Sequence, residues 1–154
     1  MTPMRSITII AWLLAAVCAG CEPDPGWHAP SLSVSVFEKE VYPVLIRDCA
    51  FHACHGSETR FFRVWGPGRA RFTPTLTTAF DPVTQEEKTE SYQRALSMVD
   101  PNHPSESLLL RKPLATAAGG AGHLGADKFG RNVYRTVDDA GYLVLSQWVY
   151  AVGK

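Results

Sequence analysis

CAFHACHG, at residues 49–56, holds two of the four cysteines of this 154-residue chain. The first thiol is Cys49, the second is Cys54, and His55 follows the second directly. The remaining cysteines, Cys18 and Cys21, lie near the N-terminus. The rest of the sequence is therefore interpreted outward from this pair of thiols and the imidazole beside them.

The spacing of these residues points to covalent attachment of haem. The usual attachment motif of haem c is C-x-x-C-H. Its two thiols form thioethers with the porphyrin vinyl groups, and the adjacent histidine reaches the iron. Here four residues separate the thiols, and this C-x4-C-H form resembles variant sites in some multihaem cytochromes. We predict one covalent haem c on Cys49 and Cys54, with His55 as the proximal iron ligand.

Two other interpretations of the stretch stay open. Cys49 and Cys54 could form a small disulfide, which an oxidising compartment permits. Alternatively, Cys49, His52, Cys54 and His55 could bind zinc, whose structural sites prefer four Cys or His ligands. Four ligands within seven residues would be cramped, so we favour haem.

The N-terminus predicts export. Residues 7–17 are apolar except for Thr8, and 11 residues are too few to cross a bilayer, so residues 1–20 are interpreted as a signal peptide. The sequence VCAGC at residues 17–21 resembles a bacterial lipobox, which would make Cys21 the lipidated N-terminus; an ordinary signal peptide is the alternative. Lipidation would anchor the protein to the membrane without spanning it.

The sequence after Cys21 bears on location. Glu22 follows Cys21, where an Asp would favour inner-membrane retention, so we expect an envelope lipoprotein facing the periplasm, with the outer membrane favoured over the inner. Residues 21–33 are rich in Pro and predict a stiff tether.

Helical patterns flank the two-thiol stretch. Ser35 to Glu38 fits a capping box, and an apolar stripe follows, which Pro43 should kink or divide. Near the C-terminus, residues 136–139 (TVDD) predict a helix start with acids in the first turn, before an apolar face that includes Trp148. Residues 86–98 and 105–111 predict two further helices.

The order of several motifs resembles the cytochrome c-like domains of planctomycete and myxobacterial exported proteins. The similar segments are FEKEVYPVL at 37–45 leading to CHG at 54–56, DPNHPSESLL at 100–109, GHLG at 122–125, and YLVLSQWV at 142–149. The resemblance implies a small, mostly α, class I cytochrome c-like domain over residues 34–154, with long loops. It also implies crossed terminal helices, in which Phe37 could pack on Trp148.

The sixth iron ligand is assigned by position. Class I cytochromes take it from the loop before the last helix, and His123 lies in such a glycine-rich segment, residues 119–130. Met98 is the second candidate, and a Met ligand would raise the haem potential relative to two histidines. His52, His103 and an open, five-coordinate iron are the remaining options.

Residues 60–72 combine four arginines with aromatic side chains. Such a mixture can bind single-stranded nucleic acid, but export and a formal net charge of zero argue against that partner. We expect a loop or short β-hairpin with the aromatics inward. One or two of the arginines could instead pair with haem propionates, because a planar guanidinium suits a carboxylate.

The function that follows is electron transfer. We expect a membrane-anchored monohaem c-type cytochrome that exchanges single electrons with redox partner proteins of the cell envelope, the haem carrying the chemistry. No enzyme motif of comparable strength is present. The alternatives are a haem peroxidase-like activity at an open iron, and a haem-free envelope lipoprotein with a Cys49–Cys54 disulfide or a small metal site.

Overall fold

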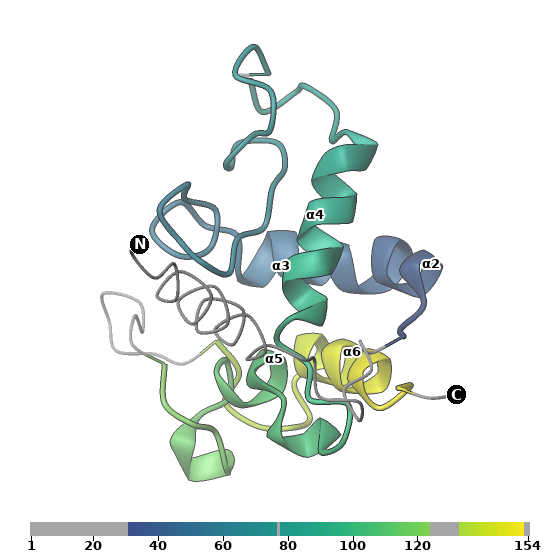
Figure 1. The fold of residues 1–154 in the computed structure, drawn as a ribbon. Helices are drawn as coiled ribbons and strands as arrows, with labels where there is room; N and C mark the ends of the chain where they lie inside the picture. Colours follow the sequence, from purple (N-terminus) through teal and green to yellow (C-terminus); the bar gives the residue numbers. More distant parts are fainter. Residues whose placement is uncertain (1–30, 77, 124–132, 153–154) are drawn as a thin grey trace, which may run out of the picture.

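The structure, a computed structural model, describes residues 31–76, 78–123 and 133–152 (Figure 1). These residues are mostly helical, as predicted, and contain no β-strand; Leu114 and Tyr134 form an isolated parallel bridge. Of the two forms expected for residues 60–72, the β-hairpin is not formed and the loop is, because that segment consists of turns and irregular loop. The helical elements, in chain order, are α2 (Val34–Val36), the π-helical turn η1 (Phe37–Val41), α3 (Tyr42–Asp48), α4 (Gln85–Leu96), the 3₁₀ turn η2 (Pro104–Glu106), α5 (Leu108–Arg111), the 3₁₀ turn η3 (Thr116–Ala118) and α6 (Ala140–Val149).

The first helical run begins two residues earlier than predicted. Ser33 is the N-cap, and its hydroxyl accepts a hydrogen bond from the Val36 amide at 3.2 Å. The predicted capping box of Ser35 and Glu38 is therefore wrong, and the Glu38 carboxylate instead accepts from the Gln85 side chain at 2.6 Å. The N-terminal run is thus capped by Ser33 and tied to α4 through Glu38.

The expected disturbance at Pro43 is confirmed. Pro43 lies in the first turn of α3, and the turn before it is π-helical, with the Tyr42 amide donating to the Phe37 carbonyl. Proline lacks an amide donor and its ring crowds the carbonyl four residues earlier. A wide turn accommodates that carbonyl without breaking the helix.

The C-terminal helix α6 starts later than predicted. Its N-cap is Asp139, so the acids precede the helix and do not occupy its first turn. The Asp139 carboxylate accepts hydrogen bonds from the amides of Arg135 at 2.6 Å and Thr136 at 3.0 Å. The carboxylate therefore closes a turn that leads into the helix.

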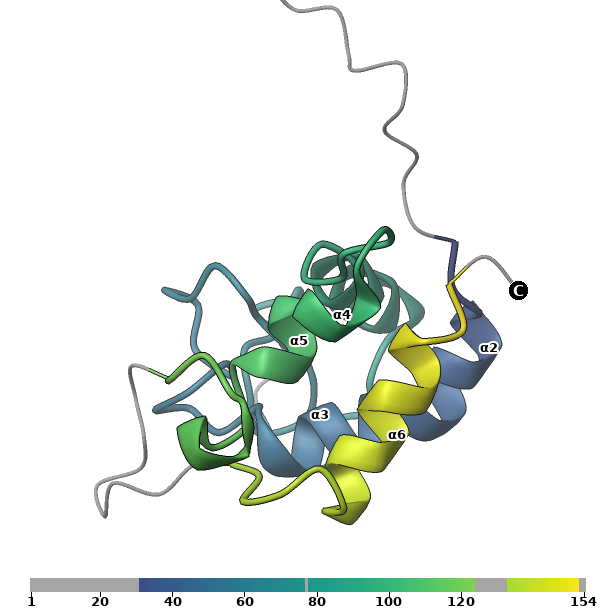
Figure 2. The same ribbon diagram turned by 90° about the horizontal axis from the view of Figure 1, so that it is seen from below.

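The core forms where α6 lies beside the N-terminal helical run (Figure 2). Phe37 and Trp148 pack with ring centroids 5.4 Å apart, which confirms the predicted contact, and their exposed fractions are 0% and 2%. Tyr92 of α4 meets Phe37 edge-on at 5.3 Å. The Trp148 indole also donates to the Ser33 carbonyl at 3.2 Å. Three helical segments distant in sequence are thus joined by one aromatic cluster.

Of the two predicted middle helices, the first matches α4 closely and the second is divided. α4 starts with a capping box, in which the Thr84 hydroxyl accepts from the Glu87 amide and the Glu87 carboxylate accepts from the Thr84 amide. The segment predicted as one short helix at 105–111 consists of η2 followed by α5. Ser107 separates them with extended backbone dihedrals.

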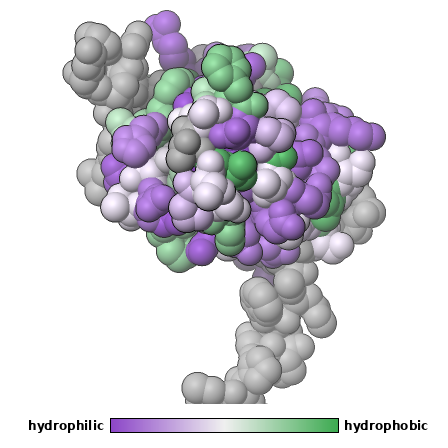
Figure 3. All heavy atoms as spheres, turned by 90° about the horizontal axis from the view of Figure 1, so that it is seen from above, coloured by the Kyte–Doolittle hydropathy of each residue, from purple (hydrophilic) through white to green (hydrophobic). Residues whose placement is uncertain are grey.

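The long connection between α3 and α4 projects at the top of Figure 1 and is anchored to α4 by buried polar groups. Arg71 donates to both carboxylate oxygens of Glu87, at 2.7 and 3.0 Å. The Trp65 amide donates to the Ser91 hydroxyl at 3.1 Å. The face seen in Figure 3 mixes apolar side chains with polar ones. Because Val64 and Trp65 of this connection are also buried, apolar packing holds it together with the polar anchors.

Candidate functional site

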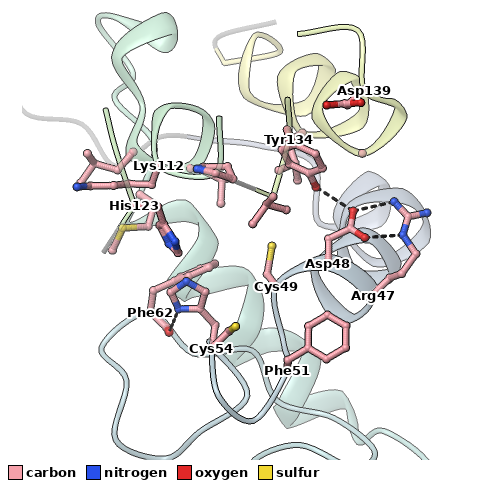
Figure 4. A pocket seen from close by; sticks show the side chains of 18 of the residues that line it. Arg47, Asp48, Cys49, Phe51, Cys54, Phe62, Lys112, His123, Tyr134 and Asp139 are labelled. Atoms are coloured by element: carbon pink, nitrogen blue, oxygen red, sulfur yellow. Dashed lines mark hydrogen bonds and ion pairs between the residues drawn. The ribbon is translucent and has the colours of Figure 1, made fainter. Parts of the chain in front are cut away.

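A cavity of about 1310 Å³ opens between the end of α3, α5 and the start of α6 (Figure 4). It is larger than the roughly 300–1,000 Å³ of typical ligand pockets. Cys49, Cys54, His55, His123 and Met98, the five residues predicted to surround the haem iron or attach the porphyrin, all line it. The structure thus brings the candidate set together around one large cavity.

The two-thiol loop is closed by its own backbone. Cys49 directly follows α3, and its carbonyl accepts from the His55 amide at 3.0 Å. The Phe51 carbonyl accepts from the amides of Cys54 and Gly56, at 2.8 and 3.0 Å. A side chain at Gly56 would place its Cβ 2.1 Å from a backbone carbonyl, so this turn requires glycine. The extra residues of the C-x4-C-H spacing form an exposed bulge at positions 51–53, which returns Cys54 and His55 to the cavity.

His55 is held in one orientation. Its Nδ1 lies 2.8 Å from the Phe62 carbonyl, and the Phe62 ring meets the imidazole edge-on at 4.7 Å. Because a carbonyl only accepts, Nδ1 carries the proton and Nε2 keeps the lone pair. A ligating histidine is normally oriented by this kind of hydrogen bond from its other ring nitrogen. Burial lowers the pKa of His55 below its ordinary value, which favours the neutral imidazole that a metal requires.

His123 lies opposite His55. Their ring centroids are 5.7 Å apart, with an angle of 59° between the rings. Two imidazoles on opposite sides of one metal, with metal–nitrogen bonds of about 2.0 Å, have nitrogens about 4 Å apart and ring centres about 6 Å apart. The observed centroid separation is close to this value, so His55 and His123 are spaced as two residues that would hold one metal ion between them.

A glycine-rich turn delivers His123 to the cavity. Gly119 and Gly122 have φ values of +93° and +70°, in the left-handed region that favours glycine. A Cβ at Gly120 would lie 1.9 Å from the Leu114 carbonyl oxygen. The turn therefore favours glycine at two positions because of the backbone conformation and at a third because of a close contact.

The surroundings of His123 and Cys49 favour the uncharged forms of both side chains. Burial lowers the pKa of His123, and the nearby cations Lys112 and Arg60 lower it further. Burial also raises the pKa of the Cys49 thiol to about 12, aided by the Asp48 charge, so this group is a protonated thiol at neutral pH. Cys49 and Cys54 are free thiols in the structure. Among the described residues, no three His, Cys, Asp or Glu side chains lie close enough to hold a metal ion, so the zinc alternative gains no support.

A second group of polar side chains on the cavity wall was missed by sequence reasoning. The Tyr134 hydroxyl donates to the Asp48 carboxylate at 3.0 Å, and Arg47 donates to both oxygens of that carboxylate at 2.7 Å (Figure 4). Burial alone would raise the pKa of Asp48, but these hydrogen bonds lower it. Gly141 of α6 packs against the pair, where a Cβ would lie 2.6 Å from the carboxylate. A glycine inside an apolar helix was the one available signal of this close approach.

The other candidate ligands and cations lie elsewhere. His52 is exposed, and the His103 side chain is 72% exposed and pairs with Asp100. Neither lines the cavity. The four arginines considered for haem propionates do not line it either, and Arg71 is committed to its buried carboxylate partner. The cations on the described wall of the cavity are instead Arg47, Lys112 and Arg135.

The predicted signal peptide, the tether up to residue 30 and the lipidation site Cys21 lie outside the described residues. Within the described ranges, no helix is both long and apolar enough to cross a membrane. Comparisons with protein-family models, with curated proteins and with solved structures found no match to this chain.

Proposed function

We propose that the chain is a membrane-anchored monohaem c-type cytochrome that carries single electrons in the cell envelope. The observation that carries the proposal is the meeting of Cys49, Cys54, His55 and His123 around one large cavity. Each residue has the state that such a site needs: two free thiols, one imidazole oriented through Nδ1, and a second imidazole facing it.

The roles of the residues follow from their chemistry. Cys49 and Cys54 would hold the porphyrin through thioethers. His55 would bind the iron through Nε2 while its protonated Nδ1 donates to the Phe62 carbonyl. His123 would be the sixth ligand, with Met98 as the second candidate on the same cavity. The haem supplies a ferric–ferrous couple when bound. If His55 and His123 both bound the iron, they would leave no position open for a peroxide, so these residues favour electron transfer over a peroxidase-like reaction.

The arrangement of the helices supports the finer assignment to a class I cytochrome c-like domain. The N-terminal run and α6 lie side by side and pack through Phe37 and Trp148, as the resemblance implies. The two-thiol loop leaves the end of α3, and the His123 turn precedes α6 in sequence. The predicted export signal and Cys21 lipidation complete the proposal by placing the domain at the envelope, on the periplasmic side, with redox proteins as partners.

The decisive experiment is a haem-stained denaturing gel with a pyridine haemochrome spectrum. The full chain is produced in a host with cytochrome c assembly that also matures another C-x4-C-H protein. Wild type should carry one covalent haem. Cys54→Ala and His55→Ala should each abolish the stain, whereas His52→Ala, an exposed histidine of the same loop, should retain it.

The sixth ligand is tested in the same material. His123→Ala should convert low-spin, six-coordinate iron to a high-spin form, and His103→Ala is the matched control outside the cavity. If Met98→Leu changed the spin state and His123→Ala left it unchanged, the sixth ligand would be reassigned to Met98. Wild type without haem, in a host that loads the comparison protein, would overturn the cytochrome proposal and favour a haem-free lipoprotein.

A further inference from the structure

Lys112 lies next to the proposed sixth ligand but outside the haem-binding motif. It directly follows α5, is half-buried, and lines the cavity. Its ammonium donates to the Gly122 carbonyl at 3.3 Å. Figure 4 shows Lys112 and His123 together on one side of the cavity. The side chain therefore contacts the peptide unit that leads into His123.

Among the described residues, backbone hydrogen bonds hold the start of this turn, at Gly120 and Ala121. The Gly120 amide donates to the Ala115 carbonyl at 3.0 Å, and the Ala121 amide donates to the Arg111 carbonyl at 2.9 Å. Gly122 comes next, with a φ of +70°, and glycine has the widest choice of backbone conformations. A contact that fixes the Gly122 carbonyl therefore limits the directions in which the His123 ring can point.

The charge of Lys112 has a separate consequence. A cation near an iron opposes the additional positive charge of the ferric state, and within a partly buried site such an effect is weakly screened. Within the described part of the chain, Lys112 and Arg60 are cations that act on His123. Removal of Lys112 would therefore lower the reduction potential as well as loosen the turn.

We propose that Lys112 is a positioning residue for His123: its ammonium holds the Gly122 carbonyl so that the imidazole faces His55, and its charge favours the reduced iron. The inference rests on the proposed function for the role of the iron. The mechanical part, that Lys112 orders the turn, concerns the chain alone and is measurable without haem.

The test compares Lys112→Met and Lys112→Arg with Lys39→Met, which removes an exposed lysine of η1 outside the cavity. In the haem-loaded full chain, exogenous imidazole competes with His123 for the iron. Without the hydrogen bond from Lys112, His123 should bind the iron less tightly and compete less well with imidazole. Loss of a charge-assisted hydrogen bond of ordinary strength should therefore raise the affinity for imidazole about tenfold in Lys112→Met. The reduction potential should fall in the same variant. Lys112→Arg should restore both values toward wild type, and Lys39→Met should change neither.

Hydrogen exchange provides the arm that does not need haem. In the full chain without haem, the Ala121 amide should exchange about tenfold faster in Lys112→Met than in wild type or Lys39→Met. Equal unfolding midpoints of the variants would exclude a general loss of stability as the cause.

The outcomes separate the two proposals. Wild type without covalent haem would overturn the cytochrome assignment. The hydrogen-exchange rates of the Ala121 amide would still decide whether Lys112 orders the turn. A loaded wild type with His123 on the iron, and with Lys112→Met equal to Lys39→Met in imidazole affinity and in exchange, would overturn the role of Lys112 alone. A lowered potential without tighter imidazole binding would also overturn the positioning role, because it would leave a purely electrostatic effect.

Discussion

The buried pair of Arg71 and Glu87 gives the sharpest test of how the long connection is held. The side chains are 7% and 0% exposed, and two guanidinium nitrogens reach the two carboxylate oxygens at 2.7 and 3.0 Å. Glu87 also accepts from the amides of Phe72 and Thr84, at 3.1 and 3.0 Å. Every oxygen of this carboxylate therefore has donors from the chain, and its replacement affects both the connection and the start of α4.

The expected magnitude follows from these contacts. Glu87→Ala leaves the Arg71 charge buried without its partner, and breaking a buried pair in this way costs about 3–5 kcal/mol. Since a domain of this size has a stability of roughly 5–15 kcal/mol, that variant is expected to be marginal. Glu87→Gln keeps the shape and one acceptor but removes the charge, so we expect a loss of about 2 kcal/mol, the value of a hydrogen bond to a charged group.

Urea unfolding of the full chain at pH 7, followed by circular dichroism, measures this loss. Glu106→Gln is the matched control, because Glu106 pairs with Arg111 at the surface and exposed pairs contribute about 0–1 kcal/mol. Replacement of both Arg71 and Glu87 by Met should recover much of the stability, since no unpaired charge remains. A Glu87→Gln variant that loses no more stability than Glu106→Gln would refute the argument.

The pair also predicts a pH dependence. Burial alone would raise the pKa of Glu87, but the hydrogen bonds from Arg71 and two amides lower it below its ordinary value. A carboxylate with a lowered folded-state pKa stabilises the fold above its unfolded-state pKa and loses that contribution as the pH falls through the folded-state value. Wild type should therefore lose stability as the pH falls below about 5, and Glu87→Gln should show a flatter profile in the same unfolding assay.

Two further substitutions probe the cavity wall. Tyr134→Phe removes the hydroxyl that donates to the half-buried Asp48 at 3.0 Å. We expect the free energy of unfolding in urea to fall by about 1–2 kcal/mol, with the covalent haem retained. An unchanged free energy of unfolding would mean that this contact contributes nothing. Gly120→Ala places a methyl group 1.9 Å from a backbone carbonyl, so the turn must move and the haem-loaded variant should contain more high-spin iron in its absorption spectrum. Gly68→Ala also strains a loop, because Gly68 has a φ of +66°, but Gly68 does not line the cavity, so this control should leave the spectrum unchanged.

The helices were predictable because their apolar spacing is local, but the first helix start was not. Ser33 and Ser35 both precede the apolar stripe, and counting to Glu38 selected the wrong one. The structure selects Ser33 because Leu32, just before it, is buried in the same core as Phe37. This is the arrangement of a hydrophobic staple, which fixes the register through tertiary packing as well as through the capping side chain.

The candidate site was predictable to the extent that its chemistry is written in short motifs. Cys49, Cys54 and His55 are adjacent in sequence, and glycines mark the turn that carries His123. The contact between Tyr134 and Asp48 joins residues 86 positions apart, and no local pattern predicts it. The pairing of Arg71 with Glu87 was missed for a related reason, because a charged residue in an irregular segment is normally expected at the surface.

The two halves of the candidate site are built independently, and this separates attachment from ligation. The two-thiol loop is closed by hydrogen bonds among its own backbone groups and the His55 ring is fixed by Phe62, so neither depends on the turn that bears His123. That turn depends instead on its glycines, on the α5 backbone and on Lys112. If the haem proposal is correct, substitutions in residues 119–123 should alter the spin state and the reduction potential of the iron while the covalent haem remains. Substitutions in residues 49–55 that remove a thiol or the His55 ring should abolish attachment of the haem. A chain in which both sets of substitutions removed the haem alike would have a site that forms only as a unit, contrary to the separate hydrogen-bonding of its two halves.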